Sequence, residues 1–86
     1  MNKKDLDTFF REHMVPPALY SIGQKEYNKI CLEDTSDGWE VYFSDANAKV
    51  GVLHYDTEDA ACHGMMDEIR KCMESFYGLT WNLSIA

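Results

Sequence analysis

The stretch GWEVYFSDANAKVGVLHYDTEDAAC, from Gly38 to Cys62, contains two strand-like runs, a polar turn between them and the beginning of the longest helical pattern in the chain. In the first run, from Trp39 to Ser44, apolar and polar side chains alternate, which is typical of a half-buried strand. We expect one face of this strand to lie in the core and the other to face outward. The core-facing residues are then Trp39, Val41 and Phe43, and the outward-facing residues are Glu40, Tyr42 and Ser44.

The second run, from Lys49 to Tyr55, is apolar on both faces apart from its ends. Gly51 lies inside it, and a glycine within a strand indicates a bulge or a close packing contact. The pattern does not decide which side chains of this strand face the core. The two alternatives are Val50 with Val52 and Leu53 with Tyr55.

Two segments have the periodicity of helices. From Lys3 to Met14 apolar residues recur on one side, Asn2 is placed to cap the start, and two prolines follow the end. The long helix has either Asp56 or Thr57 as its N-cap. It ends at Gly78, because a glycine suits the left-handed conformation of a C-terminal cap. Its apolar stripe consists of Cys62, Met65, Met66, Ile69, Met73, Phe76 and Tyr77.

The remaining segments complete an α+β fold in the order α-β-β-β-α. Glu26 to Asp34 contains a further strand, Ala18 to Gln24 is either a connector or a first edge strand, and Thr80 to Ile85 is either a short strand or a loose tail. The simplest architecture is a small antiparallel sheet of three to four strands, with the N-terminal and the long C-terminal helix on one face. Because 86 residues suffice for one domain only, we expect a single domain over residues 1–86.

The chain is acidic, with 15 Asp and Glu against 8 Lys and Arg and a net charge of −7. This charge disfavours binding to nucleic acid and to anionic membranes, and it favours a basic protein partner. A simpler explanation is that the charge only keeps a small protein soluble. The N-terminus lacks the apolar core of a signal peptide, no apolar run has the length of a membrane span, and the three irregularly spaced cysteines fit reduced thiols. We therefore expect a cytoplasmic protein.

The reactive side chains form no recognisable catalytic or metal-binding motif. The sequence has no nucleophile elbow, phosphate-binding loop, dinucleotide fingerprint or Cys-x-x-Cys pair. We therefore expect no enzymatic activity, no cofactor and no bound metal. One alternative is a small metal-dependent or catalytic regulator that uses His54, Asp56 and His63. Another is an adaptor subunit whose open sheet face docks on a larger complex.

An acidic strip provides the candidate binding surface. Between Ile30 and Ala48 the sequence contains five acidic residues and no Lys or Arg. Carboxylates beside an exposed tyrosine suit protein binding, because the ring offers apolar area and the acids attract Lys and Arg. We expect the partner-binding residues to be Glu33, Asp34, Asp37, Glu40, Tyr42 and Asp45.

Two segments of the chain resemble a known family. Gly38 to Asp45 reads GWEVYFSD, and Leu53 to Cys62 reads LHYDTEDAAC. They resemble the GxWEVYxS(E/D) strand and the (F/Y)D(T/S)E(D/E)AC helix start shared by several small immunity proteins of bacterial polymorphic-toxin and contact-dependent inhibition systems. The resemblance covers the middle third of the chain. It implies neutralisation of a cognate toxin domain in the cytoplasm. Such toxins are often nucleases with basic clefts. We expect the free protein to be a monomer.

Overall fold

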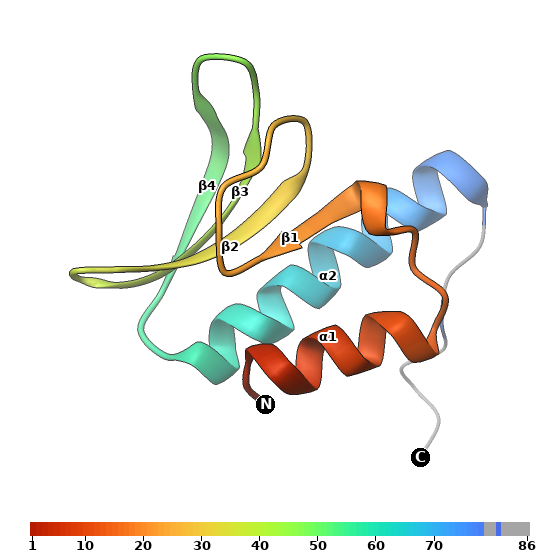
Figure 1. The fold of residues 1–86 in the computed structure, drawn as a ribbon, viewed down its shortest axis with the longest axis horizontal. Coiled ribbons are helices and arrows are strands. Elements are labelled where there is room, and N and C mark those ends of the chain that lie inside the picture. The colour runs from red at the N-terminus through yellow and green to blue at the C-terminus, as the bar shows by residue number, and fades with distance from the viewer. Residues whose placement is uncertain (79–80, 82–86) are drawn as a thin grey trace.

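The computed structural model of the protein describes residues 1–78 and Trp81, and it confirms the predicted α+β class (Figure 1). A helix is followed by four strands, which form one sheet in the order β1-β2-β3-β4, and then by a long helix. The elements are α1 (Lys3–Glu12), a short 3-10 helix η1 (Pro17–Leu19), β1 (Tyr20–Ile22), β2 (Ile30–Thr35), β3 (Gly38–Ser44), β4 (Lys49–Tyr55) and α2 (Glu58–Tyr77). The strand or tail predicted for Thr80 to Ile85 lies outside the described residues, apart from Trp81.

The sheet is antiparallel, as predicted, except at its first strand. β2 pairs with β3, and β3 with β4, in antiparallel register, whereas β1 runs parallel to β2. Of the two alternatives for Ala18 to Gln24, the edge strand is therefore the one observed. Parallel neighbours usually need a long crossover connection. Here only three residue pairs are matched, so the loop from 23 to 29 has to return only about 7 Å along the strand direction.

α1 begins where the sequence indicates and ends slightly early. The Asn2 side chain accepts the backbone N–H of Asp5, and the Asp5 carboxylate accepts that of Asn2, which completes a capping box. The helix ends at Glu12, two residues before the predicted Met14. The reason is that Met14 adopts a left-handed backbone with φ 56°, which directs the chain back so that Val15 enters the core.

α2 follows its predicted boundaries closely. Thr57 caps its start by accepting the backbone N–H of Ala60, and Gly78 ends it in the left-handed conformation with φ 68°. The first part of its apolar stripe is buried. In the last turn, however, Phe76 is 73% exposed and Tyr77 is 52% exposed. The stripe therefore continues past the part of the helix that the core covers.

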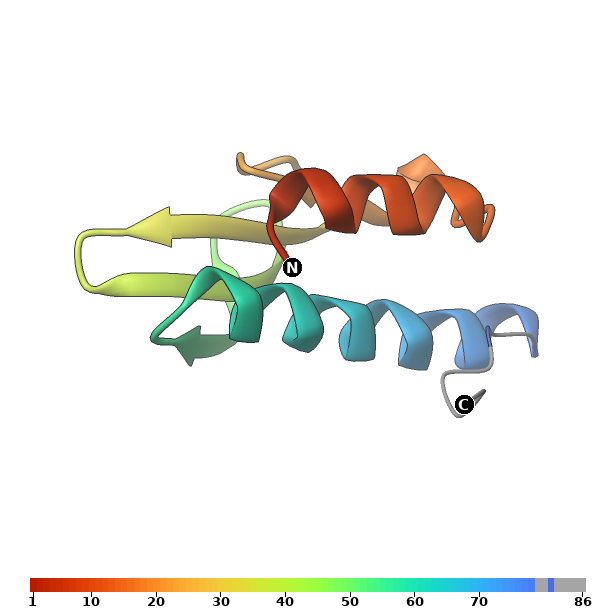
Figure 2. The same cartoon turned by 90° about the horizontal axis from the view of Figure 1, so that it is seen from below.

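The core lies between the sheet and the two helices, which are side by side on one face and begin at the same end of the molecule (Figures 1 and 2). At that end the backbone N–H of Lys3 donates to the Glu58 carboxylate at 2.9 Å, and the terminal ammonium of Met1 donates to Asp59 at 2.7 Å. The buried residues of the core are Leu6, Phe10, Val15, Leu32, Val41, Ala61, Cys62, Met65, Met66 and Ile69.

β4 contains a bulge at Gly51, which resolves the question of its core face. The register between β3 and β4 shifts at this point, and Gly51 has φ 63°. Because the bulge interrupts the alternation, the helix-facing side chains of β4 come from both sides of it, and neither predicted pair describes them alone. The pairs on the helix side are Trp39 with Tyr55, Val41 with Leu53, and Phe43 with Val50.

Tyr55 determines how closely β4 approaches α2. A Cβ atom added to Gly64 in α2 would lie 2.2 Å from the Tyr55 hydroxyl oxygen, so the tyrosine occupies the space that a side chain at 64 would need. Burial raises the pKa of Tyr55 above its ordinary value. A glycine in the middle of a helix costs stability, and here it allows the aromatic ring to pack between the helix and the edge strand.

The predicted core face of β3 is buried over part of its length only. Val41 is buried and Trp39 is half-buried against the core. Phe43 was also predicted to lie in the core, but it is 39% exposed. The prediction is wrong at Phe43 because a hollow, rather than a close contact, separates this end of the strand from α2.

The opposite face of β3 is covered, contrary to the prediction that it faces solvent. Glu40, Tyr42 and Ser44 do point away from the helices, but they are only 6%, 1% and 1% exposed. The loop from 23 to 29 lies on this side, where the Cys31 sulfur is 3.4 Å from both the backbone nitrogen and the carbonyl oxygen of Glu26. Cys31 is the cross-strand neighbour of Tyr42, so the loop shields both side chains.

Candidate partner-binding surface

The six residues predicted to bind a partner do not form one exposed strip. Asp34 and Asp37 are exposed at the turn between β2 and β3, and Asp45 is exposed in the turn at the opposite end of β3. β3 spans about 20 Å at the usual rise per residue, so these two exposed groups lie far apart. The other three residues, Glu33, Glu40 and Tyr42, are half-buried or buried and contact one another.

The buried members of this set share one cation within the protein. Glu33 and Glu40 are direct cross-strand neighbours, an arrangement in which two like charges repel. Lys49, from β4, pairs with the Glu40 carboxylate and lies 4.0 Å from that of Glu33. The Tyr42 hydroxyl donates a hydrogen bond to Glu33. We call Glu33, Glu40, Tyr42 and Lys49 the Lys49 network, in which both carboxylates contact groups of the protein itself.

Tyr42 is held in this network from two sides. The Lys49 ammonium lies 4.7 Å from the centroid of its ring, which is a cation–π contact. The pKa of Tyr42 is raised well above its ordinary value, mainly by burial and to a lesser extent by the hydrogen bond to Glu33. The hydrogen bond to Glu40 raises the pKa of Lys49, so its charge is maintained. Tyr42 is thus a buried structural side chain and does not offer the exposed ring that the sequence predicted.

A second group of acids remains exposed at the other end of the hairpin. Asp34 and Asp37 flank the turn between β2 and β3, and Asp56 follows β4 beside them, because Trp39 pairs with Tyr55. Among the described residues none of these three carboxylates has a cation within 4.0 Å. We call Asp34, Asp37 and Asp56 the hairpin-end carboxylates.

These acids lie where two segments of the backbone, the turn before β3 and the end of β4, approach each other closely. Gly38 has φ 141°, and a Cβ atom there would lie 2.7 Å from the carbonyl oxygen of Tyr55. A side chain at 38 would therefore force the turn and the end of β4 apart. Figures 1 and 2 show the turn projecting past the start of α2, so a partner can approach it. The sequence did not single out Asp56 for this surface, because its neighbours become apparent only from the register of the strands.

The histidines lie in separate places. His54 is opposite Glu40 on β4, and His63 lies on α2, where its Nδ1 is 3.4 Å from Asp59. His13 stacks on Phe9. Within residues 1–78 and Trp81, no group of three or more His, Cys, Asp or Glu side chains is arranged to hold a metal ion. The three residues of the metal or catalytic alternative therefore do not converge on one site.

The thiols occupy environments that suppress their reactivity. Cys31 and Cys62 are buried, and Cys72 is half-buried. Burial raises the pKa of all three, that of Cys62 to about 11. A nucleophilic cysteine needs a lowered pKa, because the thiolate is the reactive form. These thiols are therefore packing side chains at neutral pH.

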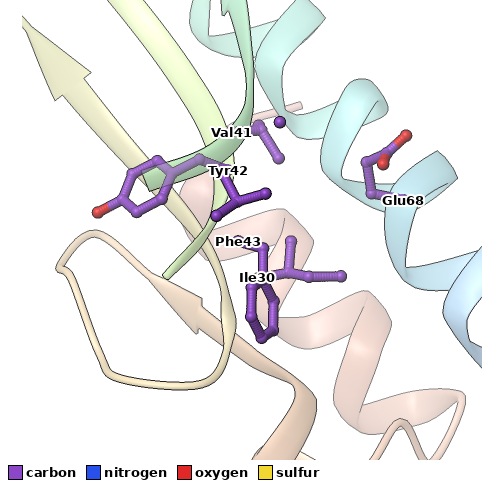
Figure 3. A pocket seen from close by; sticks show the side chains of 7 residues that line it. Ile30, Val41, Tyr42, Phe43 and Glu68 are labelled. Atoms are coloured by element: carbon purple, nitrogen blue, oxygen red, sulfur yellow. The ribbon is translucent and has the colours of Figure 1, made fainter. Parts of the chain in front are cut away.

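A hollow between the sheet and α2 is a feature that the sequence analysis missed. One cavity, of about 230 Å³, lies beside Phe43, Val50 and Gly51, with Glu68 across from them on α2 (Figure 3). Figure 3 shows Tyr42 pointing away from it. A second cavity, of about 470 Å³, continues along α2 to Cys72 and Phe76. The signal in the sequence was β4 itself, whose apolar side chains exceed what one buried face requires.

Comparison with protein-family models, with curated proteins and with solved structures gives no match to this chain. Of the helices in the described part of the chain, none is both long and apolar enough to cross a membrane.

Proposed function

We propose that this chain is an immunity protein, which binds a basic toxin domain in the bacterial cytoplasm and neutralises it without catalysing a reaction. The observation that carries the proposal is the contrast in how the acids are paired. In the Lys49 network both carboxylates lie near the cation of Lys49, whereas the hairpin-end carboxylates are exposed and have no cation within 4.0 Å in the described part of the chain. Exposed carboxylates without an internal cation can form ion pairs with the Lys and Arg side chains of a partner.

The electrostatics of the whole chain support a basic partner. The net charge is −7, so the field around the protein attracts positive surfaces and accelerates encounter with them. Asp34 and Asp37 lie at a projecting turn and Asp56 lies beside it after β4, and these segments are held by backbone pairing rather than by flexible side chains. A rigid acidic surface can occupy a basic cleft with little loss of conformational entropy on binding.

The chemistry of the remaining side chains gives less support to the other two functions. His54, Asp56 and His63 do not form one constellation, and the cysteines have raised pKa values. An adaptor that docks by the open face of its sheet would need that face to be exposed, yet Tyr42 and Glu40 at its centre are covered.

The resemblance to immunity proteins supports the same proposal from the sequence. Its strand motif coincides with β3, and its helix-start motif coincides with the end of β4 and the cap of α2. In the proposed complex Asp34, Asp37 and Asp56 contact Lys and Arg side chains that line the nucleic-acid cleft of the toxin. Occupation of that cleft excludes the polyanionic substrate, and no chemical step by this chain is needed.

The test uses the toxin domain encoded beside the gene for this chain. The purified domain is titrated with this protein while both binding and toxin activity are measured. We expect a complex of nanomolar affinity, loss of activity at a one-to-one ratio, and weaker binding at higher salt because the contact is ionic. If no neighbouring toxin domain binds, or if binding is insensitive to salt and leaves the activity unchanged, the proposal is wrong.

A further inference from the structure

The hollow between α2 and the end of the sheet consists of two apolar cavities. They share Ile30 and Phe43 in their linings, so they adjoin one another beside the helix. Among the described residues that line them, three have an ionisable side chain: Glu68, Tyr42 and Cys72. We call this the α2–β3 groove, and its principal residues are Ile30, Phe43, Val50, Gly51, Cys72 and Phe76.

Several apolar side chains that line this groove are exposed to solvent. Val50 is 49% exposed, Phe43 is 39% exposed and Phe76 is 73% exposed. They come from two strands and a helix, yet they line two adjoining cavities, with Phe43 in both. Adjoining exposed apolar residues around a concavity indicate a binding site, whereas single exposed apolar residues do not.

The geometry argues against an added β-strand as the ligand. β4 is the edge of the sheet, but the bulge at Gly51 interrupts its ladder after two residues, and Lys49 stands at its start. Bulges and lysines are the means by which natural proteins prevent edge-to-edge pairing. A second copy of the chain is disfavoured for the further reason that each copy has a net charge of −7. The groove therefore offers a place for a side chain rather than for a strand.

We propose that the α2–β3 groove receives a large apolar side chain, aromatic or aliphatic, that is flanked by Lys or Arg on the surface of a basic protein. The apolar side chain would fill the cavity beside Phe43 and Val50. Its basic neighbours would face Asp45, which lies in the turn that follows β3 and has no cation within 4.0 Å in the described residues. They would also face Glu68 on α2, whose ion pair with Lys71 at 3.1 Å is a surface pair of small strength. A binding hot spot is typically a large anchor side chain that fills a desolvated pocket, with surrounding contacts that exclude water.

This proposal rests on the proposed function, since it gives the same basic partner a second contact. The hairpin-end carboxylates would attract the partner, and the groove would hold one of its side chains. Ionic contacts at a rim mainly affect the rate of association, whereas a buried apolar anchor slows dissociation. The two surfaces should therefore be separable in kinetic measurements.

A first experiment tests the groove without the natural partner. The uniformly 15N-labelled full chain is titrated with the capped peptide Lys-Ser-Phe-Ser-Lys, and with two controls in which the phenylalanine is replaced by serine or both lysines by glutamate. We expect the first peptide alone, at millimolar concentration, to shift the amide resonances of Ile30, Phe43, Val50 and Cys72. Absence of a shift at these amides, or equal shifts with the glutamate peptide, would overturn the proposal.

Two variants locate the contact. Val50→Asp should weaken the peptide's effect about tenfold, because it places a carboxylate in the apolar wall. Met14→Asp is the matched control: Met14 is 85% exposed, its φ of 56° is one that aspartate tolerates, and the change in charge is the same. Equal responses of the two variants would count against the groove.

Other occupants give different results. If Leu83→Ser with Ile85→Ser changes the same groove amides in the absence of peptide, the chain's own C-terminal segment occupies the groove and the proposal is wrong. If the amides of Phe43 and Val50 shift with protein concentration, a second copy occupies it, and the proposal is again wrong.

A second experiment separates this inference from the proposed function. In the complex with the toxin domain, Cys72 serves as a reporter at alkaline pH, where its thiolate forms, because it is the least buried of the three thiols and lies in the groove. We expect the partner to slow the reaction of Cys72 with a maleimide, and Val50→Asp to raise the dissociation rate about tenfold. If the domain binds and is inhibited while Cys72 and Val50→Asp behave as in the free protein, the groove proposal fails and the proposed function stands.

Discussion

The two faces of β3 differ in a way that their sequence does not show. Trp39, Val41 and Phe43 make an apolar face, and Glu40, Tyr42 and Ser44 make a more polar one. The polar face is closed by a lysine and a loop, whereas the apolar face opens to solvent at Phe43. Alternation decides which side chains share a face, and elements elsewhere in the chain decide which face is covered.

The largest effect is expected on the polar face, where Lys49 neutralises the buried Glu40. Lys49→Met should lower the free energy of unfolding by about 2–3 kcal/mol, because it leaves a buried carboxylate without a cation. Urea unfolding measures the change. Lys25→Met is the control, since Lys25 is exposed and makes no ion pair among the described residues. Adding Glu40→Gln to Lys49→Met should restore at least half of the loss, and equal stability of the two lysine variants would contradict the account.

The next effect is expected on the apolar face, where Tyr55 packs against Gly64. Gly64→Ala should destabilise the protein by about 1–2 kcal/mol, because the overpacking outweighs the better helix propensity of alanine. In a Tyr55→Ala background the obstruction is removed, so the same substitution should become stabilising. Thermal or urea unfolding of the four proteins completes this double-mutant cycle. If Gly64→Ala changes the stability with the same sign in both backgrounds, Tyr55 does not obstruct a side chain at position 64.

A pH-dependent effect is expected from the loop that covers the polar face. The Glu26 carboxylate accepts hydrogen bonds from Lys29 at 2.8 Å and from Ser21 at 2.9 Å, and these contacts, with Lys29 contributing most, lower its pKa from 4.5 to about 2. Because the pKa is lower in the folded state, the contact stabilises fully above about pH 4.5 and is lost as the pH falls toward 2. Glu26→Gln should therefore make the free energy of unfolding, measured with urea, less dependent on pH between about 2 and 4.5. The control variant Glu12→Gln should leave this pH dependence unchanged.

The smallest effect on stability is expected at the open end of the apolar face. Phe43→Thr should cost about 1 kcal/mol or less, because Phe43 is 39% exposed beside a hollow. Val41→Thr should cost about 2 kcal/mol, because it buries a hydroxyl group in the core. The comparison is made by urea unfolding, and a larger cost at Phe43 than at Val41 would mean that the groove is closed in solution.

Much of the fold could be predicted from local patterns. The caps Asn2 and Thr57, the stop at Gly78 and the bulge at Gly51 are encoded by single residues whose backbone preferences are strong. The α+β class follows from their order along the chain. The parallel pairing of β1 did not follow, because a three-residue strand has no distinctive pattern and its partner is chosen by the return of the loop from 23 to 29.

The candidate site was predicted less well, since it depends on contacts between distant residues. The absence of basic residues from Ile30 to Ala48 suggested unpaired acids, but Lys49 follows directly and folds back onto Glu40 and Glu33. Asp56 joins Asp34 and Asp37 only through the register of β3 and β4. A charge count along the sequence therefore cannot distinguish acids that stabilise the fold from acids that are available to a partner.

The central claim is that the hairpin-end carboxylates, and not the acidity of the chain as a whole, bind the partner. The most direct measurement compares the affinity of two double variants for the toxin domain that we propose as the partner. The first variant combines Asp34→Lys with Asp37→Lys, and the second combines Glu12→Lys with Glu74→Lys. All four acids are exposed, and each pair of substitutions adds four charges to the net charge of −7. We expect the first variant to bind about 100-fold more weakly and the second to bind within about threefold of the unmodified protein. Equal weakening of both, or none in the first, would contradict the account.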